Sequence, residues 1–583
     1  MKKWLIVCAL FLTGAAIAFA GGRQGSSGSS SATVTIPTST RNSTPELPPN
    51  LYAPEKKIIK FDSPVVINVG HQIDPSDDTL PDGDTVENNQ WTRFLGQASN
   101  IVIKTAWTAA IGSDYDQRIS MAIASNTLPD AVVASSRNQF VKAYQAGELM
   151  DITSIFDENA GAFLKGKAAM ENGTYIAQAQ FNGKLWAIPS ATVTTDGVNL
   201  VIIRQDWLNR LGLPAPRTLE DVERAARAFL DAGFCRIGIA SPDRRARFYC
   251  TFLESSNNPY GFDPVFQALG ANPGYWTKDA SGRVVYGSIL PEMKTSLAFL
   301  NDWYRKGLLD PEMGVRAVSD EVISANATGI FFGPWWAMAY GNMSSLTNDP
   351  TADWQFYPIY NSQGEWVSRM KEFGNQYIMI SKNASPDVAK AVIVTQNIWH
   401  ASDAVFDTRI DETYWQPLRM PIANMIETEL EYQAYFQLLN GEKDREAFNI
   451  PSDPASWNVY RNSAPGRLLD TLKNWTRGTR PGTVLPISDF DQSNNDFQRA
   501  YAILTGDRVY STQRPDREIY SAIYGMTDGM QRRWSNLWAL EQAMVSNIIT
   551  GKQPLSYFDQ FVAQWKAEGG DEITAEVQSL TNN

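Results

Sequence analysis

The stretch VVINVG at residues 65–70 gives the first indication of the fold. Its β-branched residues stop at a glycine, a pattern typical of a short, buried strand. Two further strands are predicted at 101–103 and 128–133, each preceded by a predicted helix, at 91–98 and 115–125. Strands that alternate with helices favour an α/β fold with a parallel sheet and right-handed crossovers.

The same alternation continues along the chain. Thr218 and Asp221 form a capping box that starts a helix, and Gly233 ends that helix. The last third is mostly helical, and its clearest helix spans 531–550. Further strands are predicted at 183–189, 200–203, 236–240, 330–334 and 377–380.

The composition is that of a large globular protein with an acidic surface. The 583 residues are 43% hydrophobic and 20% charged, and the formal net charge is −12 at pH 7. This length allows several domains or two large lobes. Nucleic acid is excluded as a partner because no basic run could form the face that phosphates require. The 18 Trp are a hint of function, since the flat indole face suits sugars and other flat ligands.

The N-terminus predicts export. Lys2 and Lys3 precede an apolar run at 4–19, and Ala18-Phe19-Ala20 is a cleavage signal, so residues 1–20 are expected to be a signal peptide cleaved after Ala20. The alternative, a membrane anchor, would need roughly 20 apolar residues. No lipobox Cys follows the apolar run, which favours a soluble periplasmic or extracellular protein. Residues 21–60, rich in Ser, Thr, Gly and Pro, are expected to be a disordered tail.

Several short motifs occur in a characteristic order: YDQR (115–118), ASNTLPD (124–130), YQAGELMDIT (144–153), RQDWL (204–208), LGLP (211–214), GPWW (333–336) and IITG (548–551). Together they resemble the bacterial extracellular solute-binding proteins of family 1, the oligosaccharide receptors of ABC importers. GPWW is similar to the GPW segment of the maltose-binding proteins, where the first Trp stacks on sugar. The missing lipobox Cys departs from this pattern and puts membrane anchoring in doubt.

The resemblance implies a two-lobed, type II periplasmic-binding-protein fold of the α/β class, with a cleft between discontinuous lobes. Lobe 1 is expected at 61–190 plus 370–410 and lobe 2 at 196–362, with crossings near 189–200 and 360–373. A C-terminal helical region at 411–583 should add to both lobes. It also implies that the lobes close on a solute, with an oligosaccharide as the expected class, and deliver it to ABC permease subunits with ATPases. A monomer without a cofactor is expected.

The candidate ligand-binding residues are mostly aromatic side chains placed near strand ends or expected crossings. Trp335 ranks first because of the resemblance, and core packing is the alternative for it and for each of the others. His71 follows the first strand, at the carboxyl end where α/β folds gather ligands. The full set is Trp335, Trp336, Tyr340, Trp186, Asp206, Trp107, Trp91 and His71.

Enzyme and metal signatures are largely absent from the sequence. The acidic loop at 74–84 fits an EF-hand poorly, because Leu80 and Asn89 would occupy ligand positions. With two His in the chain, a His-based triad or metal site is not expected. A glycoside hydrolase with two carboxylates remains the main rival, and a receptor for peptides or other solutes is a second. Cys235 and Cys250 are consistent either with a disulfide or with two buried thiols.

Overall fold

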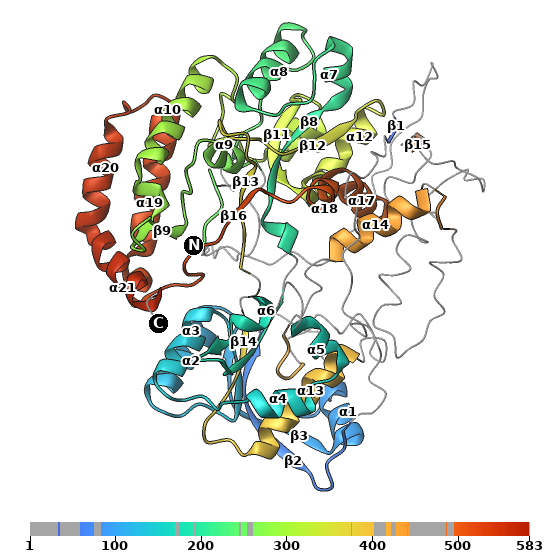
Figure 1. Cartoon of the computed structure of the whole chain (residues 1–583), viewed down its shortest axis with the longest axis vertical. Coiled ribbons are helices and arrows are strands. Elements are labelled where there is room, and N and C mark those ends of the chain that lie inside the picture. Colours follow the sequence, from blue (N-terminus) through green and yellow to red (C-terminus); the bar gives the residue numbers. More distant parts are fainter. Residues whose placement is uncertain are drawn as a thin grey trace, which may run out of the picture.

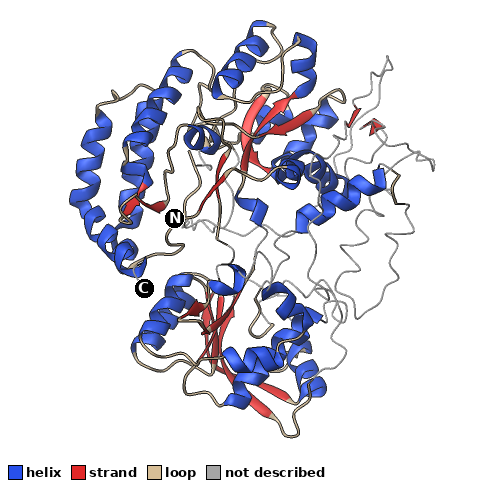
Figure 2. Ribbon diagram, in the orientation of Figure 1, coloured by secondary structure: helices blue, strands red, loops and turns tan. Residues whose placement is uncertain are grey.

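The computed structural model describes residues 33–34, 59–74, 83–168, 174–191, 194–243, 247–252, 260–372, 374, 376–401, 416–420, 427–439, 441–443, 485–486 and 495–581. The predicted signal peptide, most of the predicted tail and the centre of the acidic loop lie outside these residues. Within them, the chain forms two α/β bodies, one above the other in Figures 1 and 2. In the described part, no helix is long and apolar enough to cross a bilayer.

The first body is built on a five-stranded sheet with the order β3-β2-β4-β14-β7. Strand β2 (Val65–Ile73) pairs in parallel with β3 (Ile101–Ala110) and β4 (Ala131–Ala134). Strand β14 (Tyr377–Ile380) runs antiparallel to both β4 and β7 (Ala187–Pro189). The predicted parallel sheet is therefore confirmed for its first three strands. The antiparallel strand β14 comes after strands of the second body in the chain. The local alternation of strands and helices therefore does not reveal its pairing.

Helices cover both faces of this sheet (Figure 1). Alternate residues of β2, such as Ile67 and Val69, are fully buried against them, which explains why the β-branched run folds as it does. A short hairpin, β5 (Gln180–Phe181) and β6 (Lys184–Leu185), adds to this body. The helices are α1 (Gln90–Ser99), α2 (Ser113–Ala124), α3 (Arg137–Gln145), α4 (Thr153–Asn159), α5 (Ala162–Ala168), α6 (Thr174–Ala177) and α13 (Pro386–Ala401).

The second body has β8 (Asn199–Arg204) between β11 (Ile330–Pro334) and β12 (Trp354–Tyr357), both antiparallel to it. Parallel bridges from Ile237 to Thr328 and from Ile239 to Leu309 widen this sheet. Successive residues of β8 face two different cores. Val201 and Ile203 belong to one, and Leu200 and Ile202 to the other, so all four are buried.

Most described helices belong to this second body. The predicted capping box at Thr218 is confirmed, because its hydroxyl accepts from the backbone N–H of Asp221 at 3.3 Å. The helices are α7 (Gln205–Leu211), α8 (Leu219–Asp231), α9 (Asp263–Ala268), α10 (Pro291–Arg305), α11 (Asp320–Ser324), α12 (Ser344–Asn348), α14 (Glu427–Leu439), α17 (Asn495–Ala502), α18 (Arg508–Thr512), α19 (Asp528–Ile549), α20 (Tyr557–Trp565) and α21 (Asp571–Thr581). Small sheets pair β1 (Thr33–Val34) with β15 (Leu485–Pro486), β9 (Trp276–Lys278) with β10 (Val284–Tyr286), and β13 (Val367–Arg369) with β16 (Arg517–Ile519).

The described C-terminal helices pack mainly on the cores of the second body. Leu580 of α21 packs against the cores of both bodies. The lobe limits given by the sequence stay a prediction. The sequence left open whether Cys235 and Cys250 form a disulfide. In the structure they are two separate thiols, Cys235 half-buried and Cys250 buried.

Two chain segments connect the bodies and lie side by side. The Ser190 N–H donates to the Gln376 carbonyl oxygen at 2.8 Å, and the Gln376 N–H donates to the Ser190 hydroxyl at 3.0 Å. Gly374 lies so close that a β-carbon there would overlap the Ser190 carbonyl. On the side of the second body, Gly197 of the 3₁₀ turn Thr194–Gly197 also lies close to the other segment, because a β-carbon there would be 2.6 Å from the backbone nitrogen of Lys371. The connections are thus a pair of short, mutually hydrogen-bonded crossing segments.

Candidate functional site

A cleft of about 720 Å³ lies between the two bodies. Described residues from both bodies line it. The first body supplies the start of α2 and the first turns of α3. The second body supplies Phe252 and the segment from Tyr524 to Met526, and the crossing segment supplies Lys371 and Glu372. A volume in this range suits a small-molecule ligand.

The wall from the first body is a polar cluster around Asp116. The Ser135 hydroxyl donates to the Asp116 carboxylate, and the Gln139 side-chain amide donates to the same oxygen at 3.3 Å. The Gln139 amide oxygen accepts from the Ser135 N–H at 2.9 Å. Ser135 and Ser136 directly follow β4, and the Ser136 hydroxyl caps α3 by accepting from the Gln139 N–H at 3.4 Å. Side chains held in this way present fixed hydrogen-bonding groups to the cleft.

The opposite wall combines aromatic and charged groups. The Tyr524 hydroxyl donates to the Met370 carbonyl oxygen at 2.8 Å, which fixes the ring beside the crossing segment. Lys371 forms an ion pair with Asp196 of the first crossing at 3.1 Å. Burial raises the pKa of Glu372 well above its usual value, and the positive charge of Arg137 opposes that shift.

The two walls also touch each other directly. The Asn138 side-chain amide of α3 donates to the Met526 carbonyl oxygen at 2.5 Å. Lys142, one turn further along α3, forms an ion pair with Asp528 at the start of α19. We call these two contacts the lip of the cleft. They join the bodies at a distance along the chain from the crossing segments.

The chemistry of this cleft is that of recognition. Carboxylate, amide and hydroxyl groups can donate to and accept from ligand hydroxyls, and the Phe252 and Tyr524 rings offer apolar faces. Among the described residues, no group of three or more His, Cys, Asp or Glu could hold a metal ion.

None of the eight residues predicted from the sequence is among the described lining of this cleft. Trp335 comes nearest. It is 8% exposed, lies under Arg499, and its indole N–H donates at 3.0 Å to Asp196, the carboxylate that also binds Lys371. Trp336 is half-buried and packs against the same core, while the side chain of Tyr340 lies outside the described residues. Their role as ligand contacts stays a prediction.

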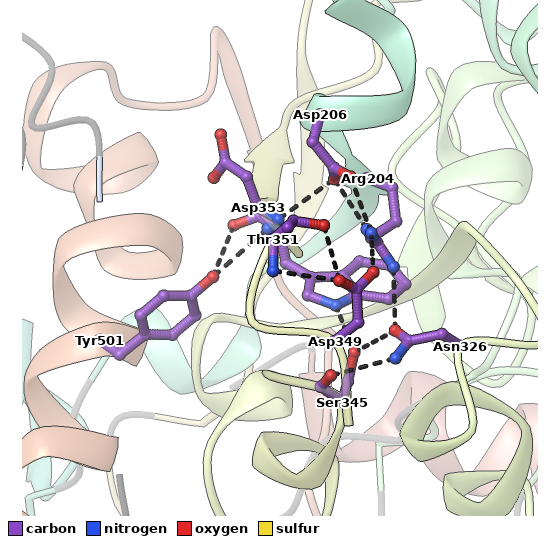
Figure 3. A network of polar contacts seen from close by, with 9 residues as sticks. Arg204, Asp206, Asn326, Ser345, Asp349, Thr351, Asp353 and Tyr501 are labelled. Carbon is purple, nitrogen blue, oxygen red and sulfur yellow. Dashed lines mark hydrogen bonds and ion pairs between the residues drawn. The ribbon is translucent and has the colours of Figure 1, made fainter. Parts of the chain in front are cut away.

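Asp206 belongs to a network that stabilises the second body (Figure 3). Both of its carboxylate oxygens accept from the guanidinium of Arg204 at 2.7 Å, and Arg204 is fully buried. Arg204 also donates to Asp349 at 2.6 Å and to Asn326 at 2.9 Å. A buried guanidinium needs these partners, because an unpaired buried charge is costly. The observed contacts of Asp206 are therefore structural.

The remaining candidates lie within the first body. Trp91 is 1% exposed and packs edge-on against Trp399, with the ring centroids 5.5 Å apart. The predicted strand at 101–103 would place Trp107 on the loop beyond it, but β3 continues to Ala110, because its alternating exposed residues suit an edge strand. Trp186 donates its indole N–H to the Phe181 carbonyl oxygen at 3.3 Å. His71 is buried beside a small hollow of about 50 Å³.

The cleft residues were missed although the sequence held a partial signal for them. Asp116 and Gln117 lie in the YDQR motif, which was interpreted only as a mark of the family. The rule that ligands gather at the carboxyl ends of strands singles out Ser135 and Ser136 as readily as His71. Nothing local marks Tyr524, because its position depends on packing between distant segments.

Comparison with known proteins agrees with this architecture. Residues 78–394 match the family described as bacterial extracellular solute-binding protein. A polygalacturonan/rhamnogalacturonan-binding protein of Bacillus subtilis, YtcQ, is 21% identical over 482 residues, which cover 79% of this chain and 82% of YtcQ. The lipoprotein LipO of the same organism is 24% identical over 228 residues, 36% of this chain and 40% of LipO.

Two solved structures from Bifidobacterium longum infantis share the fold. An extracellular solute-binding protein has a TM-score of 0.52, and a solute-binding protein described as HMO-binding and associated with an ABC transporter has a TM-score of 0.51. Each is 13% identical to this chain and covers 90% of it and 99% of the solved chain. The two-lobed fold predicted from the sequence is confirmed by these neighbours. Because the family match extends over more than half of its length, the chain belongs to the bacterial extracellular solute-binding proteins.

Proposed function

We propose that this protein is the substrate-binding component of an ABC importer. After export and removal of residues 1–20, it captures an oligosaccharide between its two bodies and delivers it unchanged to a membrane permease with its ATPases. The family supports the binding role.

The observation that carries the proposal is the polar cleft between two bodies that are joined by paired crossing segments. A ligand that touches both walls binds the closed arrangement more tightly than the open one. It therefore shifts the population toward closure by its difference in affinity for the two arrangements. A permease can then distinguish the loaded receptor from the empty one by shape.

The lining supports an oligosaccharide as the ligand. Asp116, Gln139 and Glu372 can accept or donate two hydrogen bonds each, as vicinal sugar hydroxyls require. Phe252 and Tyr524 can pack against the apolar face of a pyranose ring. YtcQ, a relative over most of this chain, is itself named as a protein that binds polygalacturonan and rhamnogalacturonan.

Thermal unfolding with a panel of oligosaccharides and peptides tests the proposal, since a ligand that binds only the folded state raises the Tm with its concentration. We expect a rise with at least one oligosaccharide, together with no hydrolysis of that compound after prolonged incubation. A rise with peptides alone would contradict the ligand class, and turnover of the glycan would indicate a glycoside hydrolase.

A further inference from the structure

The two lysines that line the cleft are already paired with carboxylates of the protein. Lys142 is paired with Asp528, and Lys371 with Asp196, whose carboxylate also accepts from the Trp335 indole. A ligand carboxylate would have to replace one of these internal partners and leave that carboxylate without its cation. Lys371 is therefore a poor receptor for an anion, and the more exposed pair of Lys142 with Asp528 opposes an anion more weakly.

The start of α3 borders the cleft, because Ser136 and Gln139 line it, and a negatively charged group of the protein already lies there. A helix N-terminus ordinarily favours an anion. Here the carboxylate of Asp116 lies at that end and accepts from Ser135 and Gln139. The protein thus supplies its own negative group where a ligand carboxylate would otherwise bind.

Arginine, the side chain best suited to a carboxylate, is absent from the described lining. The nearby Arg118 lies over the ring of Trp107 at 5.6 Å. Arg137 lies over the ring of Phe181 at 6.0 Å and is close enough to Glu372 to affect that carboxyl. The net charge of −12 adds a field that repels polyanions at long range.

From these contacts we infer that the cleft selects an uncharged oligosaccharide and discriminates against uronic-acid and other acidic glycans. This inference rests on the proposed function, because it concerns the ligand of the same cleft. By this inference, the ligand of this chain differs from the polygalacturonan and rhamnogalacturonan named for YtcQ. The selectivity would come from repulsion by Asp116 and from the internal pairing of the two lysines in the described lining.

Calorimetric titration with pairs of related glycans, one acidic and one neutral, tests the inference. Suitable pairs are trigalacturonate and its carboxyl-reduced form, cellotriuronate and cellotriose, and sialyllactose and lactose, each at low and at moderate salt. In every pair that binds, we expect the neutral member to bind at least tenfold more tightly, with a Kd that barely depends on salt. Equal or tighter binding of an acidic member would overturn the inference and leave the proposed function intact.

The variant Asp116→Asn locates the discrimination. It keeps the shape of the side chain and removes the charge. The ratio of the Kd of the acidic member to that of the neutral member should therefore fall severalfold. Asp279→Asn, which changes a carboxylate in a surface turn of the second body, is the matched control and should keep the wild-type ratio. An unchanged ratio in Asp116→Asn would contradict the assigned role of Asp116. Binding of no glycan at all, with binding of peptides, would overturn the proposed function and this inference together.

Discussion

Glu541 is a carboxyl group buried in the core of the second body between two tyrosines. Tyr249 donates to one carboxylate oxygen, and Tyr286 donates to the other at 3.0 Å. Burial raises the pKa of Glu541 from 4.5 to about 7, although these hydrogen bonds oppose the shift. The folded state therefore holds a proton at pH values where the unfolded chain has lost it.

The stability contribution of Glu541 is thus fully present below about pH 4.5 and is lost as the pH rises through about 7. We predict that Glu541→Gln, which stays neutral, flattens the fall of the free energy of unfolding between pH 5 and 8 by roughly 1 to 3 kcal/mol. Denaturant unfolding at a series of pH values measures this. A pH dependence as steep as that of the wild type would contradict the assignment.

Asp507 and Asp353 should contribute in the same direction. Burial raises their pKa values to about 7 and about 6, respectively. We therefore expect the wild-type Tm to be higher at pH 5.5 than at pH 8, because the folded state binds more protons than the unfolded chain through this range. Differential scanning fluorimetry without ligand checks this. A Tm that rises steadily with pH across the interval would show that other groups dominate.

For individual residues, the sequence indicated which types of side chain matter more successfully than it indicated what each side chain does. It indicated that aromatic side chains matter, but Trp91 and Trp335 are buried in cores, and the burial of a given Trp depends on segments far away in the chain. Asp206 follows a strand end, as expected, yet its partner is the buried Arg204. Nothing in a linear sequence reveals that Arg204 is buried and needs that carboxylate.

Among the elements, α3 and the start of α19 control how the two bodies meet at the lip of the cleft. We predict that Lys142→Met, which removes the ion pair to Asp528, increases the open population of the unliganded protein. Because part of the ligand's binding energy must then be used for closure, the ligand Kd should rise a few-fold. Small-angle scattering of the unliganded variant should show a larger radius of gyration.

Lys294→Met is the matched control for that experiment. Lys294 of α10 also forms an ion pair, with Asp559 of α20, but both residues lie within the second body. Its loss should leave the radius of gyration and the ligand Kd unchanged. If both lysine variants behave like the wild type, the lip does not govern closure.

The elements themselves were predictable where the pattern was local. The strand at 65–70, the helix capped by Thr218 and the helix near the C-terminus all exist, because β-branched runs and capping residues act within a few positions. The antiparallel pairing of β14 and the extension of β3 to Ala110 were not predictable. Both depend on which strands become neighbours, and this is decided across hundreds of residues.

At the scale of the whole molecule, the crossing segments determine whether the two bodies can approach each other and close on a ligand. We predict that Gly374→Ala forces the segments apart, because its β-carbon would overlap the Ser190 carbonyl oxygen. The variant should unfold at a lower Tm and close less completely on ligand, seen as a smaller scattering change on saturation. Gly96→Ala is the control, since its nearest contact would be an ordinary 3.8 Å to the Ile101 carbonyl oxygen and Ala favours the helix.

At the same scale, the two-lobed fold followed from the order of motifs along the chain, and the comparisons confirm it. The cleft could be expected between the lobes, but its second wall could not be located. Tyr524 and Phe252 are far apart in sequence, and only the packed structure brings them to the same cleft.

Small-angle scattering during titration with an oligosaccharide identified by thermal shift, followed by chromatography of the recovered glycan, tests the central claim most directly. We predict that the radius of gyration falls to a plateau at one ligand per chain and that the glycan is recovered intact. Saturation without any change in the radius of gyration, or recovery of shortened glycan, would contradict the account.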